Sequence, residues 1–337
     1  MSKHKKYIVS EKYSAELKTA GVLTVDNECF LNSIGFSSIE LGVFTKNSVI
    51  AKIIRVCRVI KYAIICSPKS IVVFHFPLRT TAFTWLQKIL KWKGCISVAI
   101  IVDIDGFRDN DNALLQYEMD LLAKFNFIIA HNETMCLMLK KYIANVPLLS
   151  ICLFDYAANN KKSNKQLTNI VCIAANFKKA AFINGLHTIP QIQFNLYGSK
   201  LDKGLFNEHK NINYKGSFNH IDLVDKLEGS FGLVWDGDSI ETCSAYYQIN
   251  NPHKLSLYIA AGLPLIVWYK CPFATTVVEQ GLGFAINSLA EIYTIISKTT
   301  TQNYQQMVDN VEKYRLEVVD GFFIKKVITT ILQSQHK

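Results

Sequence analysis

Short apolar runs alternate with longer segments of helical periodicity along the first half of the chain. The apolar runs predict strands at 71–76, 96–102, 127–130 and 148–154, and the periodic segments predict helices at 49–66, 80–93, 112–124 and 133–142. The strand segments are apolar at nearly every position, which is typical of parallel strands covered on both faces. This alternation predicts a doubly wound α/β domain.

The second half of the chain continues the alternation. Strands are expected near Ile170, Phe194, Ile212, Phe231, Leu265 and Phe284. The segment 304–332 predicts two helices with a break near Asp320 and Gly321. Residues 155–168 (DYAANNKKSNKQLT) are polar and lack periodicity, as is typical of a linker. We therefore predict an N-terminal domain over 1–157, a linker over 158–168 and a C-terminal domain over 169–337.

The composition agrees with a two-domain protein. A length of 337 residues suits two domains, and the hydrophobic content of 50% can fill two buried sheets. No apolar run reaches the roughly 18 residues that a membrane span needs, and the basic start MSKHKK is not followed by the apolar core of a signal peptide. The nine cysteines form no CxxC pair, which favours buried thiols over disulfides or a zinc site. These features predict a cytoplasmic protein.

The formal net charge of +10 has two interpretations, nucleic-acid binding and contact with anionic lipid. The sequence contains no nucleic-acid-binding motif, and we expect the basic excess to be spread along the chain. No nucleic-acid partner is therefore expected. Peripheral contact with anionic lipids at the inner face of the cell membrane is the favoured interpretation. Lys52, Arg55, Arg58 and Lys61 recur at steps of three in a helical segment. They form either a solvated helix face or a face that docks on a membrane.

The segment 231–269 (FGLVWDGDSIETCSAYYQINNPHKLSLYIAAGLPLIVWY) carries the strongest candidate site. It predicts a strand, a long loop, a helix and a second strand, so the loop lies at the carboxyl end of the first strand, where open α/β sheets bind ligands. Asn251 can cap the helix, and Pro252 suits its first turn. Free N–H groups at the helix start attract an anion, and Lys254 adds a full charge. The alternative is an ordinary helix start with a solvated first turn.

Three acids follow the first of these strands. Asp236, Asp238 and Glu241 can hydrogen-bond the hydroxyls of a sugar or a ribose, or they can ring a surface turn around Gly237. Asp236 and Asp238 also form an Asp-x-Asp pair of the metal-binding type.

Four segments together resemble a known family: WDGDSIETCS, NNPHKLSLYIAAGLPLIVW, IVDIDGFR and LFDY. They are similar to bacterial sugar-nucleotide glycosyltransferases. That family includes β-1,6-galactofuranosyltransferases of surface polysaccharide synthesis and glucosyltransferases that extend N-acetylglucosamine on serine-rich adhesins. The similarity runs from about residue 72 to 296. It implies a GT-B fold, in which two Rossmann-like doubly wound domains face a cleft, the C-terminal domain binds a UDP-sugar and the last helices cross back onto the N-terminal domain.

Carried over by position, the resemblance assigns roles to individual residues. The nucleotide diphosphate would be held by a segment called here the NNPHK box, which consists of Asn250, Asn251, Pro252, His253 and Lys254. Asn176 and a basic residue at Lys178 or Lys179 would also contact the donor. The chain departs from the family at Ala175, at Val102 and in a shorter loop between Cys243 and Asn250. These departures bear on the choice of acceptor and sugar, and they leave the NNPHK box unchanged.

An inverting transfer needs one general base for the acceptor hydroxyl. Asp105 is the first candidate and Asp103 the second, because both follow an apolar strand at its carboxyl end. Alternatively, this is a polar loop whose acids cap the next helix. His131, at another strand end, is the reserve candidate.

The expected activity is transfer of a hexose, galactofuranose or glucose, from a UDP-sugar to a glycan acceptor on lipid or protein. Acceptor contacts are expected near 75–79 and 103–108. No metal or other cofactor is expected, because cationic side chains can stabilise the departing diphosphate. A homo-oligomer is expected. A noncatalytic sugar-nucleotide-binding subunit is the alternative function. A Rossmann oxidoreductase is not expected, because the sequence lacks the glycine-rich fingerprint of that class.

Overall fold

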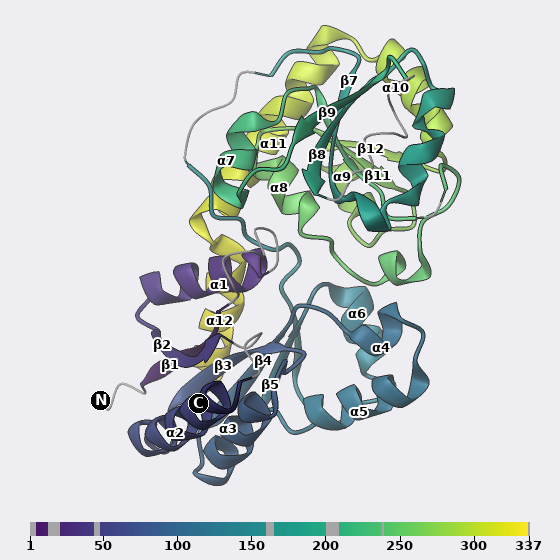
Figure 1. The fold of residues 1–337 in the computed structure, drawn as a ribbon. Coiled ribbons are helices and arrows are strands. Elements are labelled where there is room, and N and C mark those ends of the chain that lie inside the picture. Colours follow the sequence, from purple (N-terminus) through teal and green to yellow (C-terminus); the bar gives the residue numbers. More distant parts are fainter. Residues whose placement is uncertain are drawn as a thin grey trace. The chain divides into compact units, whose positions relative to one another are not determined.

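The computed structural model describes residues 5–12, 21–43, 48–159, 165–199, 209–237 and 239–335. It divides into two compact units, one of residues 1–155 with 321–337 and one of residues 156–320 (Figure 1). The first unit ends two residues before the predicted domain boundary, and it includes the last helix of the chain.

The first unit is built on a six-stranded, all-parallel sheet in the order β2-β1-β3-β4-β5-β6. Its strands are β1 (Lys6–Lys12), β2 (Ser37–Val43), β3 (Ile71–Phe76), β4 (Ile96–Ile101), β5 (Phe127–Ala130) and β6 (Leu148–Ser150). Strand β3 is buried at every position, and Phe74 lies opposite Ala99 of β4. The parallel strands predicted from continuous apolar runs are therefore confirmed.

The helices of this unit connect its strands, except for the last helix of the chain. They are α1 (Val22–Ser33), α2 (Val49–Ile65), α3 (Thr81–Trp92), α4 (Asp105–Arg108), α5 (Asn112–Leu122), α6 (Glu133–Leu139) and α12 (Phe322–Ser334). Helices α2 and α3 pack side by side (Figure 1). The core gathers apolar side chains of the sheet, such as Phe74 and Ile101, with Leu86 and Leu90 of α3.

The sequence pattern missed the first strand, helix and strand of this unit. Strand β1 has only three consecutive apolar residues, Tyr7, Ile8 and Val9, which are too few to stand out although all of them are buried. Strand β6 is shorter than the predicted 148–154. Its neighbour Cys152 has a φ of 67°, and this left-handed backbone conformation ends the extended strand.

The second unit contains another six-stranded parallel sheet, in the order β12-β11-β10-β7-β8-β9. The strands are β7 (Ile170–Asn176), β8 (Gln193–Ser199), β9 (Ile212–Gly216), β10 (Phe231–Val234), β11 (Leu265–Trp268) and β12 (Gly283–Ile286). The helices are η1 (Phe177–Lys179), η2 (Ala181–Thr188), α7 (His220–Lys226), η4 (Ala245–Gln248), α8 (Lys254–Ala260), α9 (Ala274–Glu279), η5 (Leu289–Glu291), α10 (Ile292–Lys298) and α11 (Thr301–Asp320). All six strands expected from the sequence are present.

The end of the chain forms two helices, as the sequence predicted. Helix α11 ends at Asp320, and Gly321 takes a φ of 75° before α12 begins. The carboxylate of Asp155 is fully buried and accepts the backbone N–H groups of Phe323 and Ile324 at 3.2 and 2.7 Å. Asp155 therefore caps α12 and fixes it to the first unit, although the sequence pattern had grouped this residue with the polar stretch of the linker.

Among the described residues, no helix has both the length and the apolar content needed to cross a bilayer. The nine cysteines are all free thiols. Five of them are buried as expected, whereas Cys29, Cys57 and Cys152 are exposed and Cys243 is half-buried.

Candidate functional site

The strand order of the second unit places its predicted site residues at one edge. Strands β10 and β7 are neighbours, and from them the chain proceeds in opposite directions across the sheet. In open α/β sheets such a switch point leaves a crevice at the carboxyl ends of the two strands. Asn176 ends β7, residues 177–179 follow this strand, and the loop 235–253 follows β10. The two groups of donor-site residues named from sequence thus leave adjacent strands.

Helix α8 is fixed against this switch point by one tyrosine. The Tyr258 ring packs on Gly232 of β10, where an added Cβ would lie 2.2 Å from the ring. The Tyr258 hydroxyl accepts the backbone N–H of Ala174 of β7 at 2.7 Å. Tyr258 therefore contacts both strands of the switch point, and it positions the start of α8 beside them.

The long loop before α8 is folded onto the ends of the strands. The hydroxyl of Tyr247, a buried residue of η4, donates to the Val234 carbonyl at 2.9 Å, and its ring stacks on Trp268 with centroids 6.3 Å apart. Gly237 makes the tight return possible, because an added Cβ would lie 2.1 Å from the Thr242 carbonyl oxygen. Trp235 is fully buried and Trp268 nearly so. Both tryptophans are therefore core residues rather than sugar-stacking platforms.

Lys254 is the first residue of α8, and its ammonium group lies at the end of β10. Its Nζ donates to the Trp235 carbonyl at 2.8 Å. The side chain is half-buried, and burial lowers the pKa of Lys254 below the usual 10.5, while the nearby Asp236 carboxylate partly offsets the shift. The chain therefore holds a partly desolvated cation at the crevice, where it can meet an anion.

The remaining residues of the NNPHK box differ from the expected helix start. Helix α8 begins at Lys254 with His253 at the N-cap position, so the predicted capping role of Asn251 and first-turn role of Pro252 are wrong. The reason is a turn before the helix, in which the Leu255 N–H donates to the Pro252 carbonyl at 3.0 Å. Asn251 is buried, and the side-chain oxygen of half-buried Asn250 has no hydrogen-bond partner among the described residues.

His253 stacks on a tyrosine that the sequence pattern did not single out. The rings of His253 and Tyr156 are 4.9 Å apart at 28°. Tyr156 is buried, its N–H donates to the Val318 carbonyl at 3.2 Å and its hydroxyl donates to the His220 carbonyl at 3.0 Å. The second aromatic of the LFDY segment thus supports the box. In the sequence, the only indication of a role for Tyr156 was its presence in the LFDY segment.

The other predicted donor-side residues lie in the same two loops. Asn176, Lys178, Lys179, Asp236 and Glu241 are exposed. The Asn176 side chain accepts the Lys178 N–H at 3.3 Å, which caps η1 and leaves both lysine side chains in solvent. Asp238 lies outside the described residues. These positions are compatible with donor contacts at the crevice, and the residues remain predicted ligands.

The first unit has its own switch point, between β1 and β3. His75 near the end of β3 is buried, and its Nε2 lies 3.4 Å from Nδ2 of the buried Asn27 of α1. Burial lowers the pKa of His75 to about 4, so the imidazole is neutral at pH 7. Asn27 was missed because its isolated position in a weakly amphipathic helix gave no signal.

The two candidate bases lie at the end of β4, next to β3. Asp105 pairs with Arg79 at 3.1 Å and with Arg108 at 2.8 Å. Asp103 also pairs with Arg108, whose hydrogen bond to Asp109 raises the guanidinium pKa. Both aspartates are about one-fifth exposed, at 20% and 21%. They are accessible carboxylates, but arginines hold their oxygens.

A buried acid positions this loop. Glu118 of α5 accepts the N–H groups of Asp105 at 3.1 Å and Gly106 at 2.8 Å. Burial raises the pKa of Glu118, which is 2% exposed. Gly106 allows close packing of α4 on α5, since an added Cβ would lie 2.4 Å from the Leu115 nitrogen. The alternative role of a helix cap belongs to Asp111, whose carboxylate accepts two N–H groups of α5. Sequence spacing gave no signal for Glu118.

His131 follows β5 and is poorly placed for contact with an acceptor. Its side chain is 2% exposed, and burial lowers its pKa to about 3. Its ring packs edge-on against Phe154 with centroids 4.8 Å apart. Of the three candidate bases, the two aspartates are therefore the accessible ones.

Two domain models cover most of the chain. Residues 5–152 match the glucosyltransferase 3-like N-terminal domain, and residues 171–331 match the glucosyltransferase 3-like C-terminal domain. The chain belongs to the glucosyltransferase 3-like family. It is accordingly a glycosyltransferase by family, as the four segments indicated.

Two curated relatives are similar to this glucosyltransferase 3-like chain. The β-1,6-galactofuranosyltransferase WbbI of Escherichia coli is 28% identical over 280 residues, which are 79% of this chain and 80% of the relative. Glucosyltransferase 3 of Streptococcus gordonii is 37% identical over 124 residues, which are 36% of this chain and 37% of the relative.

Solved structures show the same fold. Anabaena HepE, crystallised with UDP and glucose, superposes with a TM-score of 0.63 over 98% of this chain and 100% of that one, at 14% identity. An α,α-trehalose-phosphate synthase (UDP-forming) of Burkholderia vietnamiensis gives 0.62 over 98% and 100%, at 9% identity. The predicted GT-B fold of this glucosyltransferase 3-like chain is confirmed.

Proposed function

We propose that this protein transfers a hexose from a UDP-sugar to a glycan acceptor with inversion at the anomeric carbon. The transferred sugar that we favour is galactofuranose, and glucose is the second choice, because the names of the two relatives state these activities. The reaction serves the synthesis of a cell-surface polysaccharide or glycoprotein. It takes place in the cytoplasm at the inner face of the membrane, and the enzyme works as a homo-oligomer.

The observation that carries this proposal is the switch point of the second sheet. Loops with exposed lysines and amide side chains leave two neighbouring strands, and Lys254 lies 2.8 Å from the Trp235 carbonyl. A diphosphate entering the crevice would exchange weak solvent contacts for charge-assisted bonds to Lys254 and to Lys178 or Lys179. The same cations stabilise UDP as it leaves, so the reaction needs no metal.

The general base in this proposal is Asp105, with Asp103 as the second choice. The two aspartates follow the strand β4 and are reachable from solvent. Arg79 and Arg108 occupy the Asp105 oxygens, so an acceptor hydroxyl must displace one of these contacts before the carboxylate can take its proton. The arginines keep the carboxylate in place until the acceptor arrives. Leu78 and Arg79 provide neighbouring acceptor contacts, whereas His75, at the start of the predicted stretch 75–79, is buried.

A donor screen tests the proposal. Purified protein is incubated with UDP-galactofuranose, UDP-glucose and other UDP-hexoses plus a glycan acceptor, and the product is examined by mass spectrometry and NMR. The expected product carries a β-linked hexose. An α linkage would contradict inversion, and UDP binding with no transfer from any donor would favour a noncatalytic sugar-nucleotide-binding subunit.

A further inference from the structure

Helix α2 presents an apolar face to solvent. On a helix with about 100° per residue, Val49, Ile53, Ile60 and Ile64 lie within about 60° of one another. Their exposed fractions are 73%, 57%, 55% and 73%. Only Arg55 and Val59 are buried in this 17-residue helix. Such a large exposed apolar face is typical of an interaction surface rather than of ordinary solvated structure.

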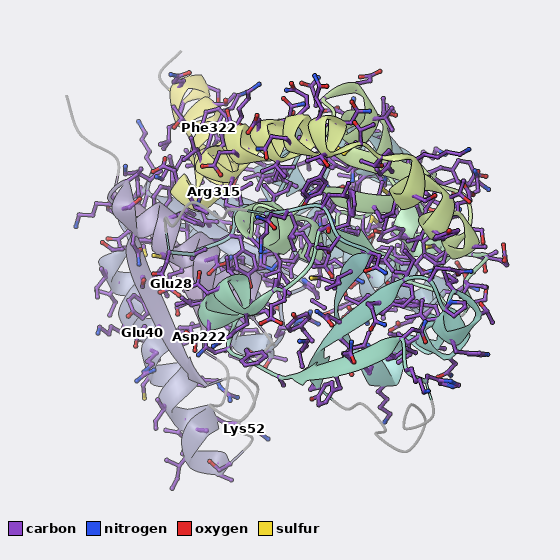
Figure 2. The ribbon with its side chains drawn as sticks, turned by 90° about the horizontal axis from the view of Figure 1, so that it is seen from above. Glu28, Glu40, Lys52, Asp222, Arg315 and Phe322 are labelled. Atoms are coloured by element: carbon purple, nitrogen blue, oxygen red, sulfur yellow. The ribbon has the colours of Figure 1, made fainter. Side chains whose placement is uncertain are left out.

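The same face is bordered by cations and lacks acids. Lys52 and Lys61 lie about 180° apart around the helix, on either side of the apolar face, and Lys52 is exposed near its start (Figure 2). Between residues 41 and 102 the chain has ten lysines and arginines and no aspartate or glutamate. This segment accounts for the entire net charge of +10, so the expectation that the basic excess is spread along the chain is wrong.

Helix α3 extends this surface with two tryptophans. Trp85 and Trp92 are 60% and 89% exposed, and Lys88 and Lys91 of the same helix are exposed as well. A groove of about 340 Å³ separates the two helices and is lined by Lys52, Arg55, Val56, Ile60 and Trp85, among others. Cations thus lie beside an apolar channel, which matches the phosphate and acyl chain of a phospholipid.

We propose that the α2–α3 face docks on a membrane rich in anionic phospholipid, with one lipid in the groove. An apolar helix face between basic flanks lies in the interface of a bilayer, and tryptophan favours that depth. A second copy of the chain is a poorer occupant, because pairing two such faces would oppose lysines with lysines and offer no acid from either helix. The surface belongs to the first unit and the donor loops to the second, so the inference does not depend on the sugar transferred.

Tryptophan fluorescence gives a direct test. Of the four tryptophans, Trp235 and Trp268 are 0% and 5% exposed, so only Trp85 and Trp92 can change their environment on docking. Vesicles of phosphatidylcholine and phosphatidylglycerol in equal parts should shift the emission of the full chain to the blue, and added salt should weaken the effect. Vesicles of phosphatidylcholine alone should give a much weaker shift. Equal shifts with both vesicle types, or none, would overturn the proposal.

Exposed substitutions then separate charge from apolar contact in a vesicle flotation assay. The double variant Lys52→Gln and Lys61→Gln should bind about 25-fold more weakly, at about fivefold per cation. The double variant Ile53→Ser and Ile60→Ser should lose about tenfold or more. Leu137→Ser and Lys140→Gln, exposed at α6, are the matched controls and should bind like the parent.

Two further measurements distinguish membrane docking from damage to the donor site and from self-association. UDP affinity and transfer to a water-soluble acceptor should be the same in these variants as in the parent, which separates this proposal from the proposed activity. Light scattering reports the oligomeric state. If the Ile53→Ser and Ile60→Ser variant dissociates an oligomer while no variant changes vesicle binding, the face belongs to a second copy and the proposal is wrong.

Discussion

Both sheets of this protein are six-stranded and parallel, but their strand orders differ and the carboxyl ends of their strands present different chemistry. In the second unit, exposed Lys178 and Lys179 follow β7, and exposed Asp236 and partly desolvated Lys254 follow the neighbouring β10. In the first unit the charged groups pair with one another, as Asp105 does with Arg79 and Arg108. The second sheet is thus suited to capture an anion from solvent. The first is suited to hold a carboxylate in one orientation.

The largest expected effect comes from the paired carboxylate. Asp105→Asn should lower turnover roughly 10²-fold or more, because the amide cannot accept the acceptor's proton. UDP affinity measured by calorimetry should not change, since the nucleotide loops belong to the other unit. Asp109→Asn is the control, because it removes another partner of Arg108 at an outward position. Equal turnover in Asp105→Asn and parent would move the base to Asp103.

The next effect tests the anion side of the comparison. Lys254→Ala should weaken UDP binding by about 1.5 to 3 kcal/mol, or roughly tenfold to a hundredfold, through loss of a charge-assisted contact. Lys298→Ala, an exposed lysine of α10, should bind UDP normally. Because Lys254 also bonds the Trp235 carbonyl, thermal unfolding must show that the variant is folded. A folded variant with unchanged UDP affinity would exclude the box from the site.

A pH series probes the buried polar groups of the first switch point. The pKa of His75 is lowered in the folded protein to about 4 from 6.5. The unfolded chain therefore binds more protons between these values, and stability falls as pH drops below about 6.5. His75 should account for about 2 kcal/mol of the loss in unfolding free energy between pH 7 and pH 5.

The matching variant is His75→Gln. It should begin less stable at pH 7, because Asn27 loses its partner, but it should lose about 2 kcal/mol less than the parent on acidification. Urea unfolding at both pH values measures this difference. Identical losses in parent and variant would show that His75 is not buried in its neutral form.

The smallest expected effect is that of metal removal. Turnover should persist in excess chelator, because Lys254 and backbone donors stabilise the leaving diphosphate. A loss of turnover that magnesium or manganese restores would contradict this prediction. The acids Asp236 and Asp238 would then have to be reinterpreted as metal ligands.

Local sequence patterns determined much of the architecture. Continuous apolar runs such as Ile71–Phe76 and Leu265–Trp268 have only one stable place, inside a parallel sheet, so their positions and the two-unit plan were predictable. The NNPHK box could also be singled out from sequence, because its residues are consecutive and stand at the start of a helix, and its role in donor binding stays a prediction. The early strand β1 and its helix were not found, since three apolar residues give no clear period.

Only the tertiary structure decided which distant residues meet. The contact of Tyr258 with Gly232 and Ala174, the stacking of His253 on Tyr156 and the capping of α12 by Asp155 each join residues that no local pattern connects. The ion pairs of Arg79 and Arg108 with Asp105 likewise join residues that no local pattern connects. Local patterns fix which face of an element is buried, because burial follows periodicity. Partners of buried polar groups depend on strand order and packing, and these emerge only when the whole chain has folded.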